Sequence, residues 1–486
     1  MESNTASFAK TKNERAVFGD VPCDLSQVDG PIHLVGIGGI GMSALARLLL
    51  ASNRSVSGSD KQASEITREL ANLGATIHIG HQESNLAKAK ALVVSTAITA
   101  DNPELALALK NGLPVFHRSR VLAALAKGQK MIAVSGTHGK TTTTGMIAQV
   151  LIDCGLDPSV VIGGIFSHIK ANAVAGKGEY FVAESDESDG THASLDSEIA
   201  VLTNVEADHL ENYPGGMEQI YKAMADFGNR ARLATVICDD DSGCQAVLPH
   251  LKGKVISYGL QKSKSTASFK YESLKGFAMR VYKSDKVLGE LELSVPGEHN
   301  KLNALAAIVV ACELGLNFSD VCASLHEFKG VDRRFQFIGE AKGIMIIDDY
   351  AHHPTEIVAT LKAARSFINE RQRLGEPARR LVVAFQPHQP GRLRDFWDEF
   401  RQAFLDSDLL LVSDVYVARG GQIEGINSKR FAQEVQHSNC HYLSGPTADL
   451  APAILKHLKG NDLVITVGAG DITTVGPNLI HLLKQA

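Results

Sequence analysis

Short aliphatic runs, each followed by a turn and then by a helical pattern, recur along this chain of 486 residues. Strands that alternate with helices form parallel sheets with helices on both faces. The pattern therefore predicts an α/β fold made of doubly wound, Rossmann-like sheets. The predicted strands are Ile32–Val35, Leu92–Ser95, Met131–Ser135, Tyr180–Ala183, Ile199–Thr203, Leu381–Phe385, Leu409–Ser413 and Leu463–Val467.

The chain is too long for one hydrophobic core, so several domains are expected. Two stretches are typical of joints between domains, the Ala-rich segment Val121–Lys127 and the segment Phe328–Arg334. Between them, alternating polar and apolar residues from 265 to 295 predict an antiparallel excursion. The predicted parts are a disordered N-terminal tail (1–28), a first Rossmann-like domain (29–126), a central domain (127–331) and a C-terminal Rossmann-like domain (332–486).

Composition excludes several classes of protein. The net charge of -5 provides no broad basic field for nucleic acid. No uncharged apolar run is long enough to span a membrane, and the polar N-terminus lacks the apolar core of a secretory signal, so we expect a cytoplasmic protein. The seven cysteines are scattered without a CxxC pair, which argues against a zinc or redox centre.

The first glycine-rich turn follows the strand at Ile32–Val35. Gly36, Gly38 and Gly41 have the G-x-G-x-x-G spacing, which lets backbone N–H groups and a helix N-terminus approach a diphosphate. Asp60 ends the next strand, at the spacing where an acid contacts a ribose hydroxyl. Ser95 and Thr96 follow another strand and could add donors to the same diphosphate. This turn alone would equally suit a nicotinamide-dependent dehydrogenase.

A second glycine-rich turn follows the strand at Met131–Ser135. It reads Gly136-Thr-His-Gly-Lys140-Thr141, a short form of the P-loop in which Val134 stands where the first glycine is usual. Backbone N–H groups of such a turn hold phosphate oxygens, Lys140 can neutralise the β and γ phosphates, and the Thr141 hydroxyl can ligate magnesium. The turn predicts a nucleoside triphosphate site, which a dehydrogenase does not explain.

Acidic and imidazole groups follow the next two predicted strands. Glu184 ends one strand, and Asn204, Asp208 and His209 follow the other. Carboxylates and imidazoles at this edge could hold the magnesium ion of the triphosphate, and we expect Glu184 and His209 to do so. Two further acids, Glu187 and Asp189, could join them or lie in a solvated loop.

These sites, in this order, resemble those of the Mur ligases, and most closely the alanine-adding branch of that family. The resemblance covers nearly the whole chain. The matching motifs are HLVGIGGIGMS (His33–Ser43), GTHGKTTTT (Gly136–Thr144), AESDESD (Ala183–Asp189), TNVEADH (Thr203–His209), PGEHNKLN (Pro296–Asn303), RRFQ (Arg333–Gln336), DDYAHHPT (Asp348–Thr355) and FQPHQPGRLR (Phe385–Arg394).

The resemblance implies an ATP-dependent ligase of peptidoglycan synthesis, with ATP and Mg²⁺ as cofactors. ATP would phosphorylate the lactyl carboxylate of UDP-N-acetylmuramic acid, and the amine of L-alanine would attack the acyl phosphate. The three domains would bind the UDP-sugar, ATP and the amino acid in chain order. The partners would be these small molecules, without nucleic acid or membrane, and the chain would be a monomer or homodimer.

The resemblance also assigns roles to individual residues. The implied catalytic residues are Lys140, Glu184, His209, Arg334 and Asp349, and the implied metal ligands are Thr141, Glu184 and His209. The implied ATP-binding residues are Gly136, Thr137, His138, Gly139, Lys140, Thr141, Thr142, Asn300 and Asn303. The implied substrate-binding residues are Gly36, Gly38, Gly39, Gly41, Asp60, Ser95, Thr96, Tyr350, His352 and Arg392.

Two departures from the family pattern bear on specificity. Gln389 and Pro390 replace an arginine and a tyrosine of the last motif, although Arg392 keeps its place. Met224 occupies the position where later-acting Mur ligases carry a carbamylated lysine, which favours the alanine-adding branch. The alternative within the family is the recycling ligase that attaches a whole tripeptide to the same UDP-sugar. The folate-polyglutamating relatives lack the first glycine-rich module.

Overall fold

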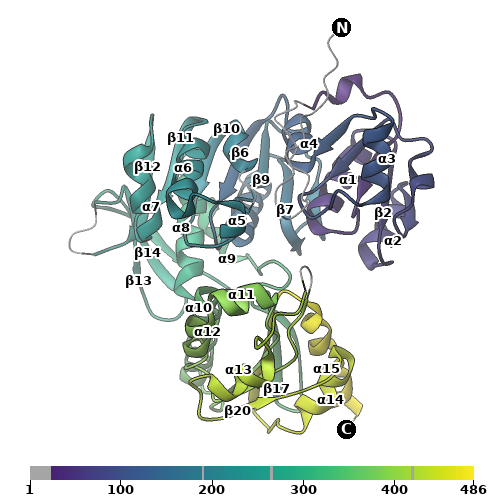
Figure 1. Ribbon diagram of the computed structural model, residues 1–486. Coiled ribbons are helices and arrows are strands. Elements are labelled where there is room, and N and C mark those ends of the chain that lie inside the picture. Colours follow the sequence, from purple (N-terminus) through teal and green to yellow (C-terminus); the bar gives the residue numbers. More distant parts are fainter. Residues whose placement is uncertain (1–22, 189–190, 263–265, 418–420, 486) are drawn as a thin grey trace. The chain divides into compact units, whose positions relative to one another are not determined.

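The structure, a computed structural model, describes residues 23–188, 191–262, 266–417 and 421–485 (Figure 1). The chain divides into two compact units. The first unit comprises Met1–Tyr271, Val281–Leu288 and Asn303–Leu325, and the second comprises Glu272–Arg280, Gly289–Leu302 and His326–Ala486.

The first sheet has five parallel strands in the order β3-β2-β1-β4-β5. The strand order reverses at β1, which pairs with β2 on one side and β4 on the other. Ligands of such sheets bind at the carboxyl ends of the strands beside this reversal. The elements are β1 (Ile32–Val35), α1 (Ile40–Ala51), β2 (Val56–Asp60), α2 (Glu65–Asn72), β3 (Thr76–Ile79), β4 (Ala91–Val94), α3 (Pro103–Lys110), β5 (Val115–His117) and α4 (Arg118–Leu125).

The second sheet has ten strands in the order β15-β14-β13-β12-β11-β10-β6-β9-β7-β8. Within this sheet, β6 lies between β9 and β10 and is parallel to both. Its strands are β6 (Lys130–Ser135), β7 (Ser159–Phe166), β8 (Ala171–Val174), β9 (Tyr180–Glu184), β10 (Ser197–Leu202), β11 (Ala231–Cys238), β12 (Val255–Leu260), β13 (Phe269–Ser273), β14 (Ala278–Lys283) and β15 (Lys286–Glu292).

Two residues connect β14 to β15, and so short a connection joins only antiparallel neighbours, in agreement with the predicted excursion. The helices of this part are α5 (Lys140–Asp153), α6 (Gly216–Gly228), α7 (Ser242–Val247), α8 (Glu298–Glu313) and α9 (Phe318–His326).

The third sheet belongs to the second unit and has six strands in the order β16-β17-β21-β18-β19-β20. Only β16 runs antiparallel to its neighbour. Successive residues such as Ile346 and Ile347 pack into separate apolar clusters, as expected for a sheet covered on both faces. Its strands are β16 (Gln336–Ala341), β17 (Ile344–Asp349), β18 (Arg380–Phe385), β19 (Leu409–Val412), β20 (Cys440–Tyr442) and β21 (Asp462–Val467).

Six α-helices accompany the third sheet, and short 3-10 helices occur along the described chain. The α-helices are α10 (Pro354–Arg373), α11 (Pro390–Asp395), α12 (Trp397–Gln402), α13 (Ser428–Glu434), α14 (Leu450–Leu455) and α15 (Val475–Gln485). The 3-10 helices are Leu25–Gln27, Glu83–Leu86, Thr191–Ser194, Leu210–Asn212, Leu248–His250, Thr447–Asp449 and Asp471–Thr474.

The sequence-based fold class is confirmed: three α/β domains contain all eight predicted strands, each within about two residues of its expected ends. Of the predicted N-terminal tail, residues 1–22 lie outside the described residues. The next residues include the 3-10 helix Leu25–Gln27, whose first turn is capped by Asp24. No helix among the described residues has both the length and the apolar character needed to cross a bilayer.

Candidate active site

The first glycine-rich turn is fixed to the end of β2. The N–H groups of Gly36 and Ile37 donate to the Ser59 carbonyl at 2.8 and 3.0 Å, and the Gly38 N–H donates to Asp60 Oδ2 at 2.9 Å. A Cβ at Gly38 would lie only 2.9 Å from that oxygen. A side chain at position 38 would therefore displace the Asp60 carboxylate that holds the turn.

Helix α1 begins directly after this turn with a bare N-terminus. Its N-cap is Gly39, and no side chain caps it. The unpaired N–H groups of such a helix start attract anions. Ser95 and Thr96 follow β4, the strand next to β1, so they belong to the same edge of the sheet. One carboxylate oxygen of Asp60 already accepts a hydrogen bond from the Gly38 N–H of the turn.

A buried carboxylate that the sequence analysis missed lies under this turn. Glu104 is fully buried and accepts hydrogen bonds from Ser59 Oγ and Asn85 Nδ2, both at 2.6 Å. His33 and His81 lie 3.6 and 3.3 Å from its oxygens. Burial would raise the pKa of Glu104, but the hydrogen-bonding partners outweigh it and hold this pKa at about 2. The carboxylate thus remains charged and fixes Ser59 of β2 by a hydrogen bond. The Ser59 carbonyl accepts the hydrogen bonds from the glycine-rich turn.

The second glycine-rich turn joins β6 to α5 and is tied to the segment after β10. Gly136 and Gly139 have φ of 133° and 79°, and a Cβ at Gly136 would lie 2.2 Å from Thr203 Oγ1. Asn204 Oδ1 accepts from the His138 N–H at 2.7 Å, and Asn204 Nδ2 donates to the His138 carbonyl at 2.9 Å. Asn204, expected only at this edge, therefore shapes the phosphate loop.

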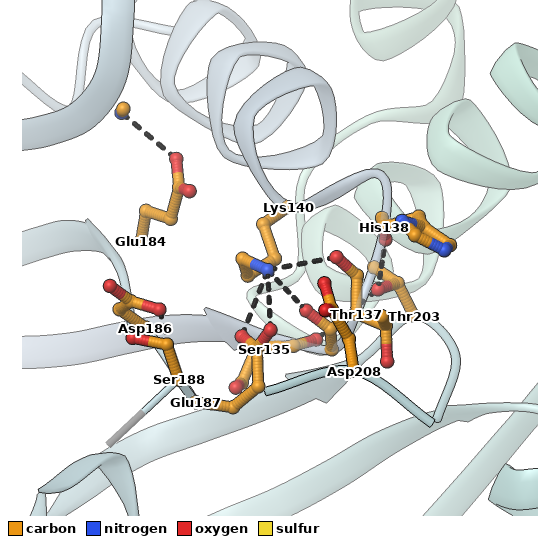
Figure 2. Close-up of polar contacts among 12 residues, drawn as sticks. Ser135, Thr137, His138, Lys140, Glu184, Asp186, Glu187, Ser188, Thr203 and Asp208 are labelled. Atoms are coloured by element: carbon orange, nitrogen blue, oxygen red, sulfur yellow. Dashed lines mark hydrogen bonds and ion pairs between the residues drawn. The ribbon is translucent and has the colours of Figure 1, made fainter. Parts of the chain in front are cut away.

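Lys140 begins α5 and is held at the mouth of the turn. Its Nζ donates to the Gly136 carbonyl at 2.5 Å, to the Thr137 carbonyl at 3.0 Å and to Glu187 Oε1 at 3.0 Å. Figure 2 shows these contacts meeting at the Lys140 amino group. Burial would lower the pKa of Lys140, but the nearby carboxylates, Glu187 first, raise it above the ordinary value. Lys140 therefore carries a positive charge at neutral pH.

Glu187 is buried, so the alternative of a solvated loop does not apply to it. Burial raises its pKa to about 7, while the Lys140 ammonium acts in the opposite direction. The neighbouring Asp186 pairs with Arg118 at 2.5 Å. Burial would raise the pKa of Asp186, but Arg118 and Lys140 hold it well below its usual range. Asp189 lies outside the described residues.

Thr141 and Glu184 come together as the predicted magnesium site requires. The Thr141 hydroxyl donates to Glu184 Oε2 at 2.9 Å, and the same oxygen accepts from the Gly163 N–H at 2.9 Å. A hydroxyl and a carboxylate next to the phosphate loop are the oxygen ligands that Mg²⁺ prefers, so these residues fit the ion. His209 has a left-handed backbone (φ 53°), and its Nε2 lies 3.5 Å from Asp208 Oδ2.

The two asparagines of the fifth motif lie on α8. Asn303 accepts from the Thr143 hydroxyl at 3.1 Å and lies against Gly139, where a Cβ would come within 2.8 Å of its Oδ1. Asn300 Nδ2 donates to the Pro296 carbonyl at 2.7 Å. Thr142 is buried on α5. Asn303 therefore supports the phosphate loop, whereas the described contact of Asn300 is local.

In the second unit, Asp349 is a buried hydrogen-bond acceptor at the end of β17. It accepts from the N–H groups of Phe335 and Ala351, both at 2.8 Å, and from the Thr360 hydroxyl at 3.1 Å. Burial raises its pKa to about 6. The Arg334 guanidinium lies 5.0 Å from the centre of the Tyr350 ring. Asp349 thus acts by positioning the segments that carry Arg334 and Tyr350.

His352 and Arg392 border a small group of rings in the same unit. The His352 ring lies edge-on to those of Tyr350 and His388, with centroids 5.1 and 5.9 Å apart. Burial lowers the pKa of His352 to about 3, so the imidazole is neutral at physiological pH. Arg392 Nη1 lies 3.5 Å from His388 Nδ1.

The structure also locates the residues that depart from the family pattern. Gln389 has a φ of 71° and precedes Pro390, which occupies the first turn of α11. Proline at that position fixes the start of the helix. Met224 is fully buried on α6.

Several residues near the two turns escaped the sequence analysis. These are Glu104, Arg118, Asp186 and the supporting role of Asn204. Arg118 directly follows β5, whose carboxyl end lies at the same edge as the first glycine turn, and this position could have identified it. For Glu104, on the helix α3, the sequence offered no comparable signal.

Profiles of one family match most of the chain. The profile described as "Mur ligase family, catalytic domain" matches residues 31–130, "Mur ligase middle domain" matches 134–311, and "Mur ligase, glutamate ligase domain" matches 333–470.

Individual relatives agree with these matches. The UDP-N-acetylmuramate–L-alanine ligase of Pelobacter propionicus is 43% identical over 460 residues, covering 93% of this chain and 98% of that protein. The solved UDP-N-acetylmuramate-alanine ligase of Thermotoga maritima has a TM-score of 0.81 at 29% identity, covering 94% of this chain and 100% of that one. A murein peptide ligase of Psychrobacter arcticus, 23% identical with a TM-score of 0.71, covers 94% of this chain and 99% of its own and shares the fold.

Proposed function

The chain belongs to the Mur ligase family, and we propose that it is the ATP-dependent ligase that joins L-alanine to UDP-N-acetylmuramic acid in peptidoglycan synthesis. The observation that carries this proposal is the identity of 42 to 43% over at least 93% of the chain to relatives with that named activity. The lysine-bearing phosphate loop and the bare helix start after β1 supply the two anion sites that such a reaction needs.

In the proposed reaction, a lactyl carboxylate oxygen attacks the γ-phosphorus of ATP and the bond to ADP breaks. The ammonium group of L-alanine loses one proton to solvent, and the resulting amine attacks the acyl carbon. Phosphate leaves, and a second proton is lost to solvent as the amide forms. The first step brings two anions together. Lys140 and the N-terminus of α5 would offset the charge on the transferring phosphoryl group.

We propose that Thr141, Glu184 and His209 hold a Mg²⁺ ion. When bound, the ion would neutralise phosphate charge and orient the phosphoryl group for transfer. The hydrogen bond between the Thr141 hydroxyl and Glu184 supports the first two ligands. The proposal that His209 is the third ligand is based on the family resemblance and on its position after β10.

The remaining implied roles are proposals of the same kind. Gly36, Gly38, Gly39 and Gly41 would hold the diphosphate of the UDP-sugar, with Asp60, Ser95 and Thr96 at the same edge. Gly136, Thr137, His138, Gly139 and Thr142 would hold ATP phosphates, Asn300 and Asn303 would serve the adenine side, and Arg334 would reach the nucleotide. In the second unit, Tyr350, His352 and Arg392 would bind the amino acid, with Asp349 as a positioning residue.

We also propose the domain borders 29–126, 127–331 and 332–486, which separate the three sheets. A cytoplasmic location and a monomeric or homodimeric state complete the proposal. Size-exclusion chromatography with light scattering tests the oligomeric state.

Phosphate release from ATP tests the function. Release should require both UDP-N-acetylmuramic acid and an amino acid, and L-alanine should be preferred over glycine and L-serine. A strong preference for the tripeptide L-alanyl-γ-D-glutamyl-meso-diaminopimelate would instead identify a recycling ligase. Release that depends on neither substrate would contradict both.

A further inference from the structure

All the donors of the Lys140 ammonium are used within the protein. An ammonium group has three N–H donors, and Nζ has three acceptors within 3.0 Å: the Gly136 carbonyl, the Thr137 carbonyl and Glu187. Both carboxylate oxygens of Glu187 lie within 3.0 Å of the ammonium. A phosphate oxygen can therefore contact Lys140 only if one of these acceptors is displaced.

The backbone on either side of the Glu187 side chain is held in place. Its backbone carbonyl accepts a hydrogen bond from the Tyr213 hydroxyl, and the next carbonyl, of Ser188, accepts from Asn212 Nδ2 at 2.7 Å. Asp186, one residue before, is held by Arg118 at 2.5 Å. The side chains of Lys140 and Glu187 are only 14% and 8% exposed, so little water screens their attraction.

From this geometry we propose that Glu187 is a positioning residue that holds Lys140 in a resting position and releases it to the phosphates of a bound nucleotide. The inference rests on the proposed function in one respect, that the turn after β6 binds ATP. The new element is a competition, in which the Glu187 carboxylate and a nucleotide phosphate bind the same Lys140 ammonium group.

The competition predicts a specific effect on affinity. Part of the free energy of binding is used to displace Glu187 from Lys140, so a weaker acceptor at position 187 should tighten nucleotide binding. Glu187→Gln keeps the shape of the side chain and removes its charge. A hydrogen bond to a charged partner is stronger than a neutral one by about 1 kcal/mol, which corresponds to roughly a fivefold change in affinity.

A second variant separates this competition from a general effect of negative charge. Asp186→Asn removes the same charge one residue away, and Asp186 also lies close enough to affect Lys140. Its ion pair, however, is with Arg118. The other acids beside Lys140 are Glu184, bonded to Thr141, and Asp208, drawn in Figure 2.

The experiment measures ADP binding to the full chain by calorimetry, with a chelator present to exclude metal ions and at a pH above 8, where Glu187, whose pKa is about 7, is charged. We expect Glu187→Gln to bind ADP about five times more tightly than the wild type and Asp186→Asn to stay within about twofold. The KM for ATP should fall in Glu187→Gln without a matching loss of kcat, because the interaction gained is shared by ground and transition states. Unchanged binding of UDP-N-acetylmuramic acid shows that each variant is folded.

Unchanged or weaker ADP binding by folded Glu187→Gln would overturn the inference, as would equal tightening by Asp186→Asn. If Glu187→Gln fails to fold, Glu187→Asp provides the test: its shorter side chain lengthens the ion pair, and it too should bind ADP more tightly than the wild type. A wild type that binds no ADP would contradict the proposed function itself, whereas wild-type binding with no effect of either substitution would contradict only the role of Glu187.

Discussion

The glycine-rich turn after β1 and the one after β6 share a strand, a tight turn and a helix N-terminus, but the side chains around them differ. The first turn offers backbone N–H groups, with the Asp60 carboxylate at Gly38 and the Arg118 guanidinium close to Gly41. The second places Lys140 among three acidic side chains and adds the hydroxyl of Thr141. Backbone donors suffice for a diphosphate that stays intact. A phosphoryl group that is transferred needs a cationic side chain that can follow it, and it needs protein ligands for a metal ion.

The largest expected effect comes from Lys140, whose ammonium group lies within the second turn itself. Lys140→Met should lower the rate of ligation at least about a thousandfold, because the transferring phosphoryl group loses its cation. Binding of UDP-N-acetylmuramic acid, followed by calorimetry, should change less than about twofold. Lys130→Met, at an exposed lysine paired with Glu179 at the start of β6, is the matched control. Near-wild-type turnover of Lys140→Met would contradict the assignment of phosphoryl transfer to the second turn.

Gly38→Val tests the first turn in the same way. A side chain there meets Asp60 Oδ2 at 2.9 Å and Thr67 Cγ2 at 3.1 Å. The overlap should raise the Kd for the UDP-sugar about tenfold to a hundredfold, for a steric cost of about 1–3 kcal/mol, with little change in the KM for ATP. Gly460→Val is the control, since a Cβ at that exposed glycine would meet nothing within 4 Å. Tight NADH binding by the wild type without UDP-sugar binding would reassign this turn.

Glu104 tests whether the first turn depends on the charge buried beneath it. Glu104→Gln should lower the free energy of unfolding of the first domain by about 2 kcal/mol, because bonds to a charged acceptor are lost. The folded-state pKa of about 2 lies below the ordinary 4.5, so the stabilisation is present above pH 4.5 and is lost as the pH falls toward 2.

Hydrogen exchange of the β1 and β2 amides measures this effect. Protection in the wild type should exceed that in Glu104→Gln at pH 6, and the difference should shrink as the pH falls below 4.5. The control is Glu83→Gln, at an exposed acid in the 3-10 helix Glu83–Leu86. A difference that is constant with pH would mean that the charge of Glu104 has no part in it.

The smallest expected effect is on the metal requirement of the second turn. Glu184→Ala should raise the Mg²⁺ concentration for half-maximal activity about tenfold, because Thr141 loses its carboxylate partner. UDP-sugar binding should show no such dependence. Titrations of activity with Mg²⁺, with His209→Ala in parallel, measure the effect. A metal requirement unchanged in both variants would exclude these residues as ligands.

The sequence by itself determined eight of the strands, the two glycine-rich turns and the residues at their ends. These features depend on short-range chemistry: β-branched runs favour strands, and positive φ at Gly136 and Gly139 requires a residue without a side chain. The family resemblance also placed Thr141 and Glu184 in one metal site, and the structure brings them together because β6 and β9 are neighbouring parallel strands.

Only the tertiary structure decided which charged groups meet. Glu187 pairs with Lys140 across 47 residues, and Arg118 reaches Asp186 across 68. From the sequence, Glu187 was as compatible with a solvated loop as with a site, and Arg118 was not singled out at all. Such pairs depend on the order of strands in the sheet and on the path of the connecting segments. Local sequence preferences do not specify either, because both are set by packing between parts of the chain that are distant in sequence.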